Sequence, residues 1–190
     1  MNVLVIPEDS RKDKYILKPL FKSLFRAIGR PTARVRVCED PVLGGVHEAL
    51  KSSRMSEIIG RHGGMTEVFI LCIDRDGELK RRDRLRTLER EFDGDDRVFV
   101  AENAWEELET WVLAGLDLPD DWRWSDVGAE VQVKERYFDR VVQDRRVHRA
   151  PGGGRKPLGE EAARRINAIR QKCPEDFDAL ARRLEAIVVN

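Results

Sequence analysis

The sequence predicts an α/β fold, with a parallel-rich sheet of about four strands flanked by helices and a C-terminal helical extension. Apolar runs alternate with amphipathic helical patterns over residues 1–116, and this order of elements is typical of a parallel sheet built through right-handed crossovers. Beyond residue 116 the alternation stops. We therefore expect an α/β core at residues 1–116, with an irregular segment and C-terminal helices at residues 117–190 packed on it as one compact unit.

Composition limits the class of protein. Charged residues make up 37% of the 190 residues and the formal net charge is zero, which is typical of a globular domain with a highly charged surface. No apolar stretch approaches the roughly 20 residues of a membrane span, and no signal-peptide pattern is seen, so we expect a cytoplasmic protein without membrane attachment. Cys38, Cys72 and Cys173 lack paired spacing, and the first two lie in apolar strand-like runs, so we expect buried free thiols and no zinc site.

The chain begins with a predicted strand and helix. Residues 2–7 form a continuous apolar run typical of a buried strand. Residues 10–28 place apolar side chains at helical spacing, with Ser10 and Asp13 as the expected cap pair. Pro19 interrupts that helical pattern in its early turns.

The remaining elements follow from the same patterns. We predict further strands at residues 35–38, 67–73 and 98–100, and helices at residues 45–60, from about residue 78 to 92, and at 104–115. Residues 93–96 are typical of a turn. In the extension, residues 159–188 predict two short helices divided at Cys173 and Pro174.

Carboxylates follow the first and third predicted strands directly. Glu8 ends the run at residues 2–7, and Asp74 and Asp76 end the run at residues 67–73. Because the carboxyl ends of parallel strands meet at one edge of the sheet, we expect these side chains to lie in one crevice. Three carboxylates there raise one another's pKa unless a cation lies between them, and an oxygen-only ligand set suits Mg²⁺ or Mn²⁺. The pattern therefore favours metal-assisted phosphate chemistry.

Charge is distributed unevenly along the chain. Residues 91–126 contain twelve acidic and two basic residues, whereas residues 134–156 contain eight basic and three acidic residues. Zero net charge argues against indiscriminate coating of nucleic acid, but a local basic segment is compatible with an enzyme acting on a polyanion. The candidate nucleic-acid contacts are Arg145, Arg146, Arg149, Arg155 and Lys156. The alternative is that these runs are solvated helix faces.

The Glu after the first strand and the Asp-x-Asp after the third resemble the Toprim fold of topoisomerases, primases, recombination proteins and nucleases of the overcoming-lysogenization-defect type. More narrowly, the chain resembles small stand-alone Toprim-like proteins encoded beside ATPases in bacterial phage-defence (abortive infection) loci. Those proteins carry Glu-aliphatic-Glu-x-Trp after a strand, here residues 107–111. They also end in helices with an acidic-Phe stretch, here residues 174–177.

The resemblance implies a Mg²⁺-dependent nuclease that hydrolyses phosphodiester bonds of DNA or RNA, acting as the effector of an ATPase-associated antiviral defence system. It implies that Asp74 and Asp76 hold the metal and that Glu8 is a general acid/base or second-metal ligand. Glu109 completes the metal shell, with Glu107 as the alternative, because two residues two apart on a helix cannot both point inward. The implied partner is an ATPase of the AAA or ABC type. The resemblance does not decide whether the chain forms a homodimer.

A second interpretation comes from a different class of function. A degenerate Toprim-like scaffold could serve as a noncatalytic interaction module that binds the ATPase through residues 134–156 and through exposed Trp122 and Trp124. The residues around Asp74 and Asp76 would then be an ordinary turn. Metal binding separates the two interpretations, because a noncatalytic module has no need of Mg²⁺ at these carboxylates.

Overall fold

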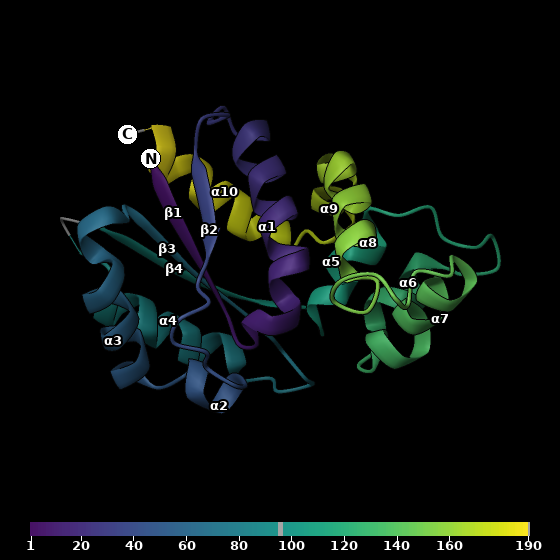
Figure 1. The fold of residues 1–190 in the computed structure, drawn as a ribbon, viewed down its shortest axis with the longest axis horizontal. Helices are drawn as coiled ribbons and strands as arrows, with labels where there is room; N and C mark the ends of the chain where they lie inside the picture. The colour runs from purple at the N-terminus through teal and green to yellow at the C-terminus, as the bar shows by residue number, and fades with distance from the viewer. Residues whose placement is uncertain (95–96, 190) are drawn as a thin grey trace.

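The computed structural model describes residues 1–94 and 97–189. It has the predicted α/β architecture, a four-stranded parallel sheet with helices on both faces and a C-terminal helix (Figure 1). Asp95 and Asp96, in the turn predicted at residues 93–96, lie outside the described residues. Across the described ranges, no helix combines the length and the apolar character needed to cross a membrane.

Strands and helices alternate through the first part of the chain, as predicted. The core elements are β1 (Asn2–Pro7), α1 (Ser10–Ala27), β2 (Arg34–Val37), α2 (Val46–Ala49), α3 (Ser52–His62), a 3₁₀ turn η1 (Gly63–Met65), β3 (Val68–Asp74), α4 (Arg81–Phe92), β4 (Val98–Ala104) and α5 (Leu108–Ala114). The extension contains α6 (Trp124–Ala129), a π-helical turn η2 (Lys134–Phe138), α7 (Asp139–Asp144), α8 (Arg155–Ala162), a 3₁₀ turn η3 (Ala163–Arg165), α9 (Ile166–Lys172) and α10 (Phe177–Val189).

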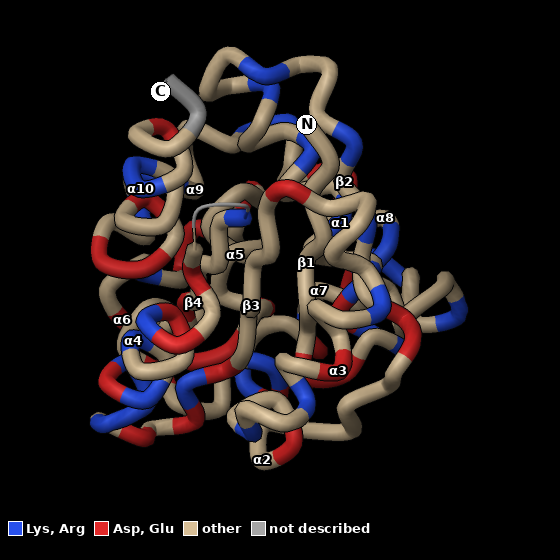
Figure 2. The backbone as a smooth tube through the Cα atoms, turned by 90° about the vertical axis from the view of Figure 1, so that its left-hand side faces the viewer, with Lys and Arg blue, Asp and Glu red and all other residues tan. Residues whose placement is uncertain are grey.

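The strands lie in the order β2-β1-β3-β4, and all neighbouring pairs are parallel. Val3 lies opposite both Val35 and Val68, and Asp74 lies opposite Ala104. The central strands β1 and β3 have helices on both sides, which explains their continuous apolar sequences. Charged residues surround these two strands on the helices and loops, as Figure 2 shows.

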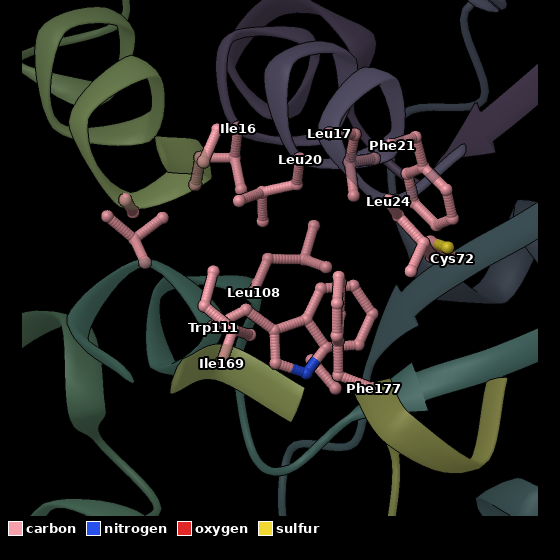
Figure 3. Packing of buried hydrophobic residues seen from close by; sticks show 14 of the residues in the cluster. Ile16, Leu17, Leu20, Phe21, Leu24, Cys72, Leu108, Trp111, Ile169 and Phe177 are labelled. Atoms are coloured by element: carbon pink, nitrogen blue, oxygen red, sulfur yellow. The ribbon is translucent and has the colours of Figure 1, made fainter. Parts of the chain in front are cut away.

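Two hydrophobic clusters cover the two faces of the sheet. Alternate side chains of β1 point to opposite faces of the sheet. Val3 and Val5 belong to the larger cluster, with α1, α5 and the extension. Leu4 and Ile6 belong to the smaller cluster, with α2, α3 and α4. In the larger cluster, Trp111 of α5 packs edge-on against Phe177 of α10, with ring centroids 5.0 Å apart (Figure 3). The predicted core and extension therefore share one hydrophobic core.

Several predicted boundaries are wrong. The helix predicted at residues 45–60 is divided into α2 and α3, because Lys51 takes an extended backbone conformation between them. Strand β4 continues to Ala104, so α5 begins only at Leu108 and Trp105 lies in the loop before it. The cap of α1 is Asp9, whose side chain accepts the Arg11 N–H, and not Ser10.

The extension contains more helix than predicted. The irregular segment after residue 116 includes α6 and α7, and residues 155–189 form three helices instead of two. The predicted division at Cys173 and Pro174 is confirmed, since α9 ends at Lys172 and α10 begins at Phe177.

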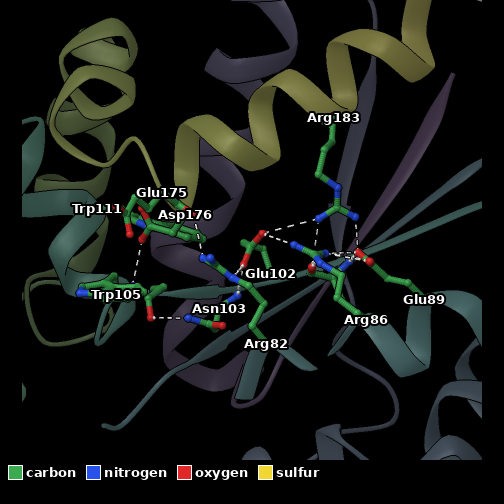
Figure 4. Close-up of polar contacts among 12 residues, drawn as sticks. Arg82, Arg86, Glu89, Glu102, Asn103, Trp105, Trp111, Glu175, Asp176 and Arg183 are labelled. Atoms are coloured by element: carbon green, nitrogen blue, oxygen red, sulfur yellow. Dashed lines mark hydrogen bonds and ion pairs between the residues drawn. The ribbon is translucent and has the colours of Figure 1, made fainter. Parts of the chain in front are cut away.

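The outer edge of β4 is covered by an arginine cluster (Figure 4). The side chain of Glu102 is fully buried, and it accepts hydrogen bonds from Arg82 at 3.2 Å and Arg86 at 2.8 Å, both from α4. Arg183 of α10 pairs with Glu102 and with Glu89, which also binds Arg86. These contacts join α4 to α10 across an edge strand that would otherwise present unpaired backbone groups.

The three cysteines are buried and free, as predicted. Burial raises the pKa of the Cys38 thiol to about 11. It raises the pKa values of the Cys72 and Cys173 thiols well above their usual range as well.

Helices α1 and α8 approach each other closely at Gly159. Pro19 lies inside α1 and has no N–H, so it cannot donate to the carbonyl of Tyr15 four residues earlier. Gly159 of α8 packs against this carbonyl, and a Cβ atom added at Gly159 would lie 2.6 Å from the Tyr15 oxygen. The position therefore requires glycine for steric reasons.

We expect Gly159→Ala to lower the free energy of unfolding by about 1–3 kcal/mol, because the methyl group forces α8 away from α1. Gly60→Ala is the matched control, since Gly60 is exposed in α3 with no atom within 4 Å of an added Cβ. That change should raise stability by about 0.5–1 kcal/mol. Urea unfolding measures both, and a neutral Gly159→Ala would contradict the close approach.

Candidate functional site

The carboxyl ends of β1 and β3 bring the three predicted carboxylates to one edge of the sheet. Glu8 follows β1 directly, and its Oε2 accepts the N–H of Asp74, the last residue of β3, at 3.5 Å. Asp76 lies in the next turn with φ +51°, a left-handed conformation that Asp tolerates better than most residues, and Gly77 follows with φ +70°. The charge of Asp76 acts on Glu8, so the three side chains form one group.

The start of α5 supplies Glu109 to this group. The Leu108 N–H donates to Asp74 Oδ1 at 2.8 Å, which ties the first turn of α5 to the end of β3. Glu109 is buried, with 4% of its surface exposed, and its charge acts on Asp74. The structure thus places Glu109, the preferred fourth ligand, beside Asp74.

Glu107 occupies a different position from the one predicted. It precedes α5 in an extended conformation, with φ −127° and ψ 155°, and its Oε2 accepts the Lys134 N–H at 2.6 Å. The argument that Glu107 and Glu109 diverge on one helix is therefore wrong, because only Glu109 is helical. Burial raises the pKa of Glu107 to about 7, and the charge of Glu109 adds to this effect.

Asp13 is a fifth carboxylate of the group that the sequence did not reveal as a site residue. It lies in the first turn of α1, where its Oδ2 accepts the Asp9 N–H at 3.1 Å. Its charge acts on Asp74, and the charges of Glu109 and Glu8 act on it. An acidic residue in a first helical turn is ordinary, so no sequence signal distinguishes Asp13 from a cap residue. We call Glu8, Asp13, Asp74, Asp76 and Glu109 the carboxylate cluster.

Burial and mutual repulsion raise the pKa values of three carboxyl groups of the cluster, Glu8, Asp13 and Asp74. Burial, followed by the charge of Asp76, raises the pKa of Glu8 to about 7. Burial, with the charges of Glu109 and Glu8, raises the pKa of Asp13 to about 7. The pKa of Asp74 is raised well above its usual range by burial and then by Glu109 and Glu8. In this site the carboxyl groups are stabilised by binding protons or by a cation bound among their oxygens.

Arg155 is the buried cation at this site. Its Nη2 donates to Glu109 Oε1 and its Nη1 donates to the Gly152 carbonyl at 3.0 Å, with only 9% of the side chain exposed. The predicted nucleic-acid contact at Arg155 is therefore corrected, because the side chain faces Glu109 in the interior. Arg81, which is also buried, provides a second positive charge 3.6 Å from Asp76.

Arg75 points away from the carboxylate cluster, toward Trp105 and Glu106. Its guanidinium carbon lies 3.5 Å from the ring centroid of Trp105, and it pairs with Glu106. The Glu106 carboxylate also accepts the Gly77 N–H at 2.6 Å, and its carbonyl accepts the Arg75 N–H at 2.7 Å. Glu106 thus fixes the turn that carries Asp76, a role that no sequence signal indicated.

The other predicted contact residues differ in exposure. Arg146, Arg149 and Lys156 are exposed, whereas Arg145 pairs with Glu161 at 2.7 Å. The tryptophans expected to be exposed are half-buried. Trp124 donates its Nε1–H to the Lys172 carbonyl at 3.1 Å, and Trp122 packs edge-on against Tyr137 at 4.8 Å.

The donor set fits a hard divalent cation in chemistry, although its side chains are not closed around an ion. Within residues 1–94 and 97–189, no group of three or more His, Cys, Asp or Glu side chains is arranged to hold a metal. Glu8, Asp74 and Asp76 nevertheless offer only carboxylate oxygens, the ligands that Mg²⁺ prefers. Burial, and after it the charges of neighbouring carboxylates, raise the pKa values of Glu8 and Asp74.

The chain matches no protein-family model, no curated protein sequence and no solved structure. The likeness to Toprim proteins therefore depends on the residues and strand positions described above.

Removing the positive charge of Arg155 leaves Glu109 buried without its partner. We expect Arg155→Met to lower the free energy of unfolding by about 3–5 kcal/mol. The control Arg165→Met breaks a surface pair with Asp117, whose side chain is 79% exposed, and should cost less than about 1 kcal/mol. Guanidinium denaturation measures both. The double variant Arg155→Met/Glu109→Gln should recover much of the loss, and equal losses in the two single variants would contradict the buried pairing.

Stability should depend on pH through the carboxylate cluster. Burial raises the pKa values of Glu8 and Asp13 to about 7, so between about pH 4 and pH 7 the folded chain binds more protons than the unfolded chain. Without metal, their contribution to the free energy of unfolding is full below pH 4 and is lost as the pH rises through 7.

Asp13→Asn removes one of these titrating groups and should stabilise the metal-free protein at pH 8 by about 1–3 kcal/mol. The exposed Asp120→Asn is the control and should change little. Thermal unfolding between pH 4 and pH 8 measures the slope. A slope that Asp13→Asn leaves unchanged would show that Asp13 is not a buried titrating group.

Proposed function

We propose that this chain is a Mg²⁺- or Mn²⁺-dependent nuclease of the Toprim type that hydrolyses phosphodiester bonds. The supporting observation is the carboxylate cluster, in which Glu8, Asp74 and Asp76 meet at the carboxyl edge of a parallel sheet. Buried carboxylates that repel one another oppose folding, and strongly perturbed groups of this kind concentrate at functional sites.

The residues have separate roles in this proposal. Asp74 and Asp76 hold the metal, and Glu109 lies beside Asp74 with its position fixed by Arg155. When bound, Mg²⁺ supplies charge neutralisation of the phosphodiester, a lower pKa for a bound water and stabilisation of the leaving oxygen. In the metal-free protein, burial and the charge of Asp76 raise the pKa of Glu8 to about 7, which is the range of a general acid/base near neutral pH.

The proposal includes the role of effector beside an ATPase in a defence system. This part depends on the likeness of residues 107–111 and 174–177 to small Toprim-like proteins. The two segments contact each other: the Trp111 Nε1–H donates to Asp176 Oδ2 at 2.7 Å, and the Trp105 N–H donates to the same oxygen at 2.9 Å. These hydrogen bonds join helix α5, which carries Glu109, to the residues that precede α10.

Metal binding is the first test, because it requires no partner protein. We expect Mg²⁺ or Mn²⁺ at pH 8 to raise the melting temperature of the wild type and of the exposed control Asp120→Asn/Asp121→Asn. The variant Asp74→Asn/Asp76→Asn should show no such rise, because it lacks the ligands. Calorimetry gives the stoichiometry.

Cleavage is measured next, with labelled DNA and RNA. We expect cleavage that needs the metal, stops with EDTA and is lost in Asp74→Asn/Asp76→Asn. A folded wild type that binds neither metal and cleaves neither polymer would contradict the proposal and favour the noncatalytic interaction module.

A further inference from the structure

A basic groove lies between α1 and α8, outside the carboxylate cluster. It encloses about 580 Å³, a size typical of ligand-binding cavities. Lys14, Lys18 and Lys22 line it from α1 and Lys156 lines it from α8, the neighbouring helix in Figure 1. Glu39 and Glu160 are also at its walls, which leaves a net charge of +2. We call this cavity the α1–α8 groove.

The lysines of α1 form a regular row. They recur every four residues on one face of the helix, about 6 Å apart along its axis. Lys14 pairs with Glu39 at 2.5 Å. In the described part of the chain, Lys18, Lys22 and Lys156 have no carboxylate within ion-pairing distance. Ammonium groups gathered in this way attract an anion with regularly spaced charges.

An aromatic ring lies among these lysines. Tyr15 lines the groove, and the Lys14 Nζ lies 5.5 Å from the centroid of its ring. Its ring packs on the loop before α8 so closely that a Cβ at Gly152 would lie 2.5 Å from a ring carbon. A fixed ring in a positively charged groove suits the stacking of an unpaired base, whereas the bases of a duplex are already paired and stacked.

The groove and the carboxylate cluster share helix α1. Helix α1 starts two residues after Glu8, and Asp13 of the cluster directly precedes Lys14. The lysine row and one carboxylate of the candidate site therefore belong to the same helix.

We propose that the α1–α8 groove binds a single-stranded segment of DNA or RNA, with Lys18, Lys22 and Lys156 contacting phosphates and Tyr15 stacking on a base. The inference names the form of nucleic acid that the proposed nuclease binds. It rests on that proposed function only for the cleavage of the bound strand. Binding itself needs neither the metal nor cleavage. Of the basic residues predicted from the sequence, only Lys156 belongs to this groove.

Fluorescence anisotropy in EDTA tests binding apart from cleavage, with labelled oligothymidylate, oligouridylate and a duplex as probes. The wild type should bind the single strands more tightly than the duplex. Lys18→Glu/Lys22→Glu should weaken single-strand binding at least about tenfold and reduce the slope of log affinity against log salt by about 1.4. Tyr15→Leu should reduce the preference for single strands.

Two controls separate the groove from net charge and from the nuclease proposal. Arg90→Glu/Arg123→Glu makes the same change in charge at exposed positions outside the groove and should weaken binding less than about twofold. Asp74→Asn/Asp76→Asn removes negative charge from the candidate site and should bind single strands at least as tightly as the wild type, so lost cleavage with retained binding leaves the groove inference standing.

Three results would overturn the inference. The first is a wild type that binds no single strand at low salt. The second is equal weakening by the groove and control variants. The third is equal binding of duplex and single strand with no effect of Tyr15→Leu. Circular dichroism confirms that each variant is folded.

Discussion

Parallel strands end at one edge of the sheet, and here that edge brings carboxyl groups together in partly buried positions. Glu8, Asp13 and Asp74 are partly withdrawn from water beside one another, and each has a raised pKa. The surrounding structure holds this arrangement in place. The Leu108 N–H binds Asp74, and Arg155 reaches Glu109 from the C-terminal extension. The extension is thus part of the site as well as part of the core.

The sequence predicted the sheet well because β1 and β3 are buried on both sides and are therefore continuously apolar. It missed the second half of β4, where Glu102 and Asn103 are polar yet buried. Glu102 is tolerated there because arginines from α4 and α10 surround it. Such compensation comes from residues distant in sequence, which local periodicity does not report.

The residues of the candidate site also fall into two groups, those that the sequence indicated and those that only the structure revealed. The predicted strand ends indicated Glu8, Asp74 and Asp76 as candidate site residues. The resemblance to Toprim proteins indicated Glu109. Asp13 and Glu106 were missed because their importance depends on tertiary neighbours. Arg155 was misassigned because a basic run gives the charge of a side chain but not its burial. The sequence therefore revealed the carboxylates and left the residues that position them to the structure.

The buried thiols give this chain built-in reporters of local opening. Alkylating reagents attack the thiolate, and burial both hides the sulfur and disfavours that form. Cys72 lies at the centre of β3, Cys38 just beyond edge strand β2, and Cys173 between α9 and α10. The order in which the three become modified would rank the kinetic lability of the sheet centre, its edge and the helical extension without any engineered label.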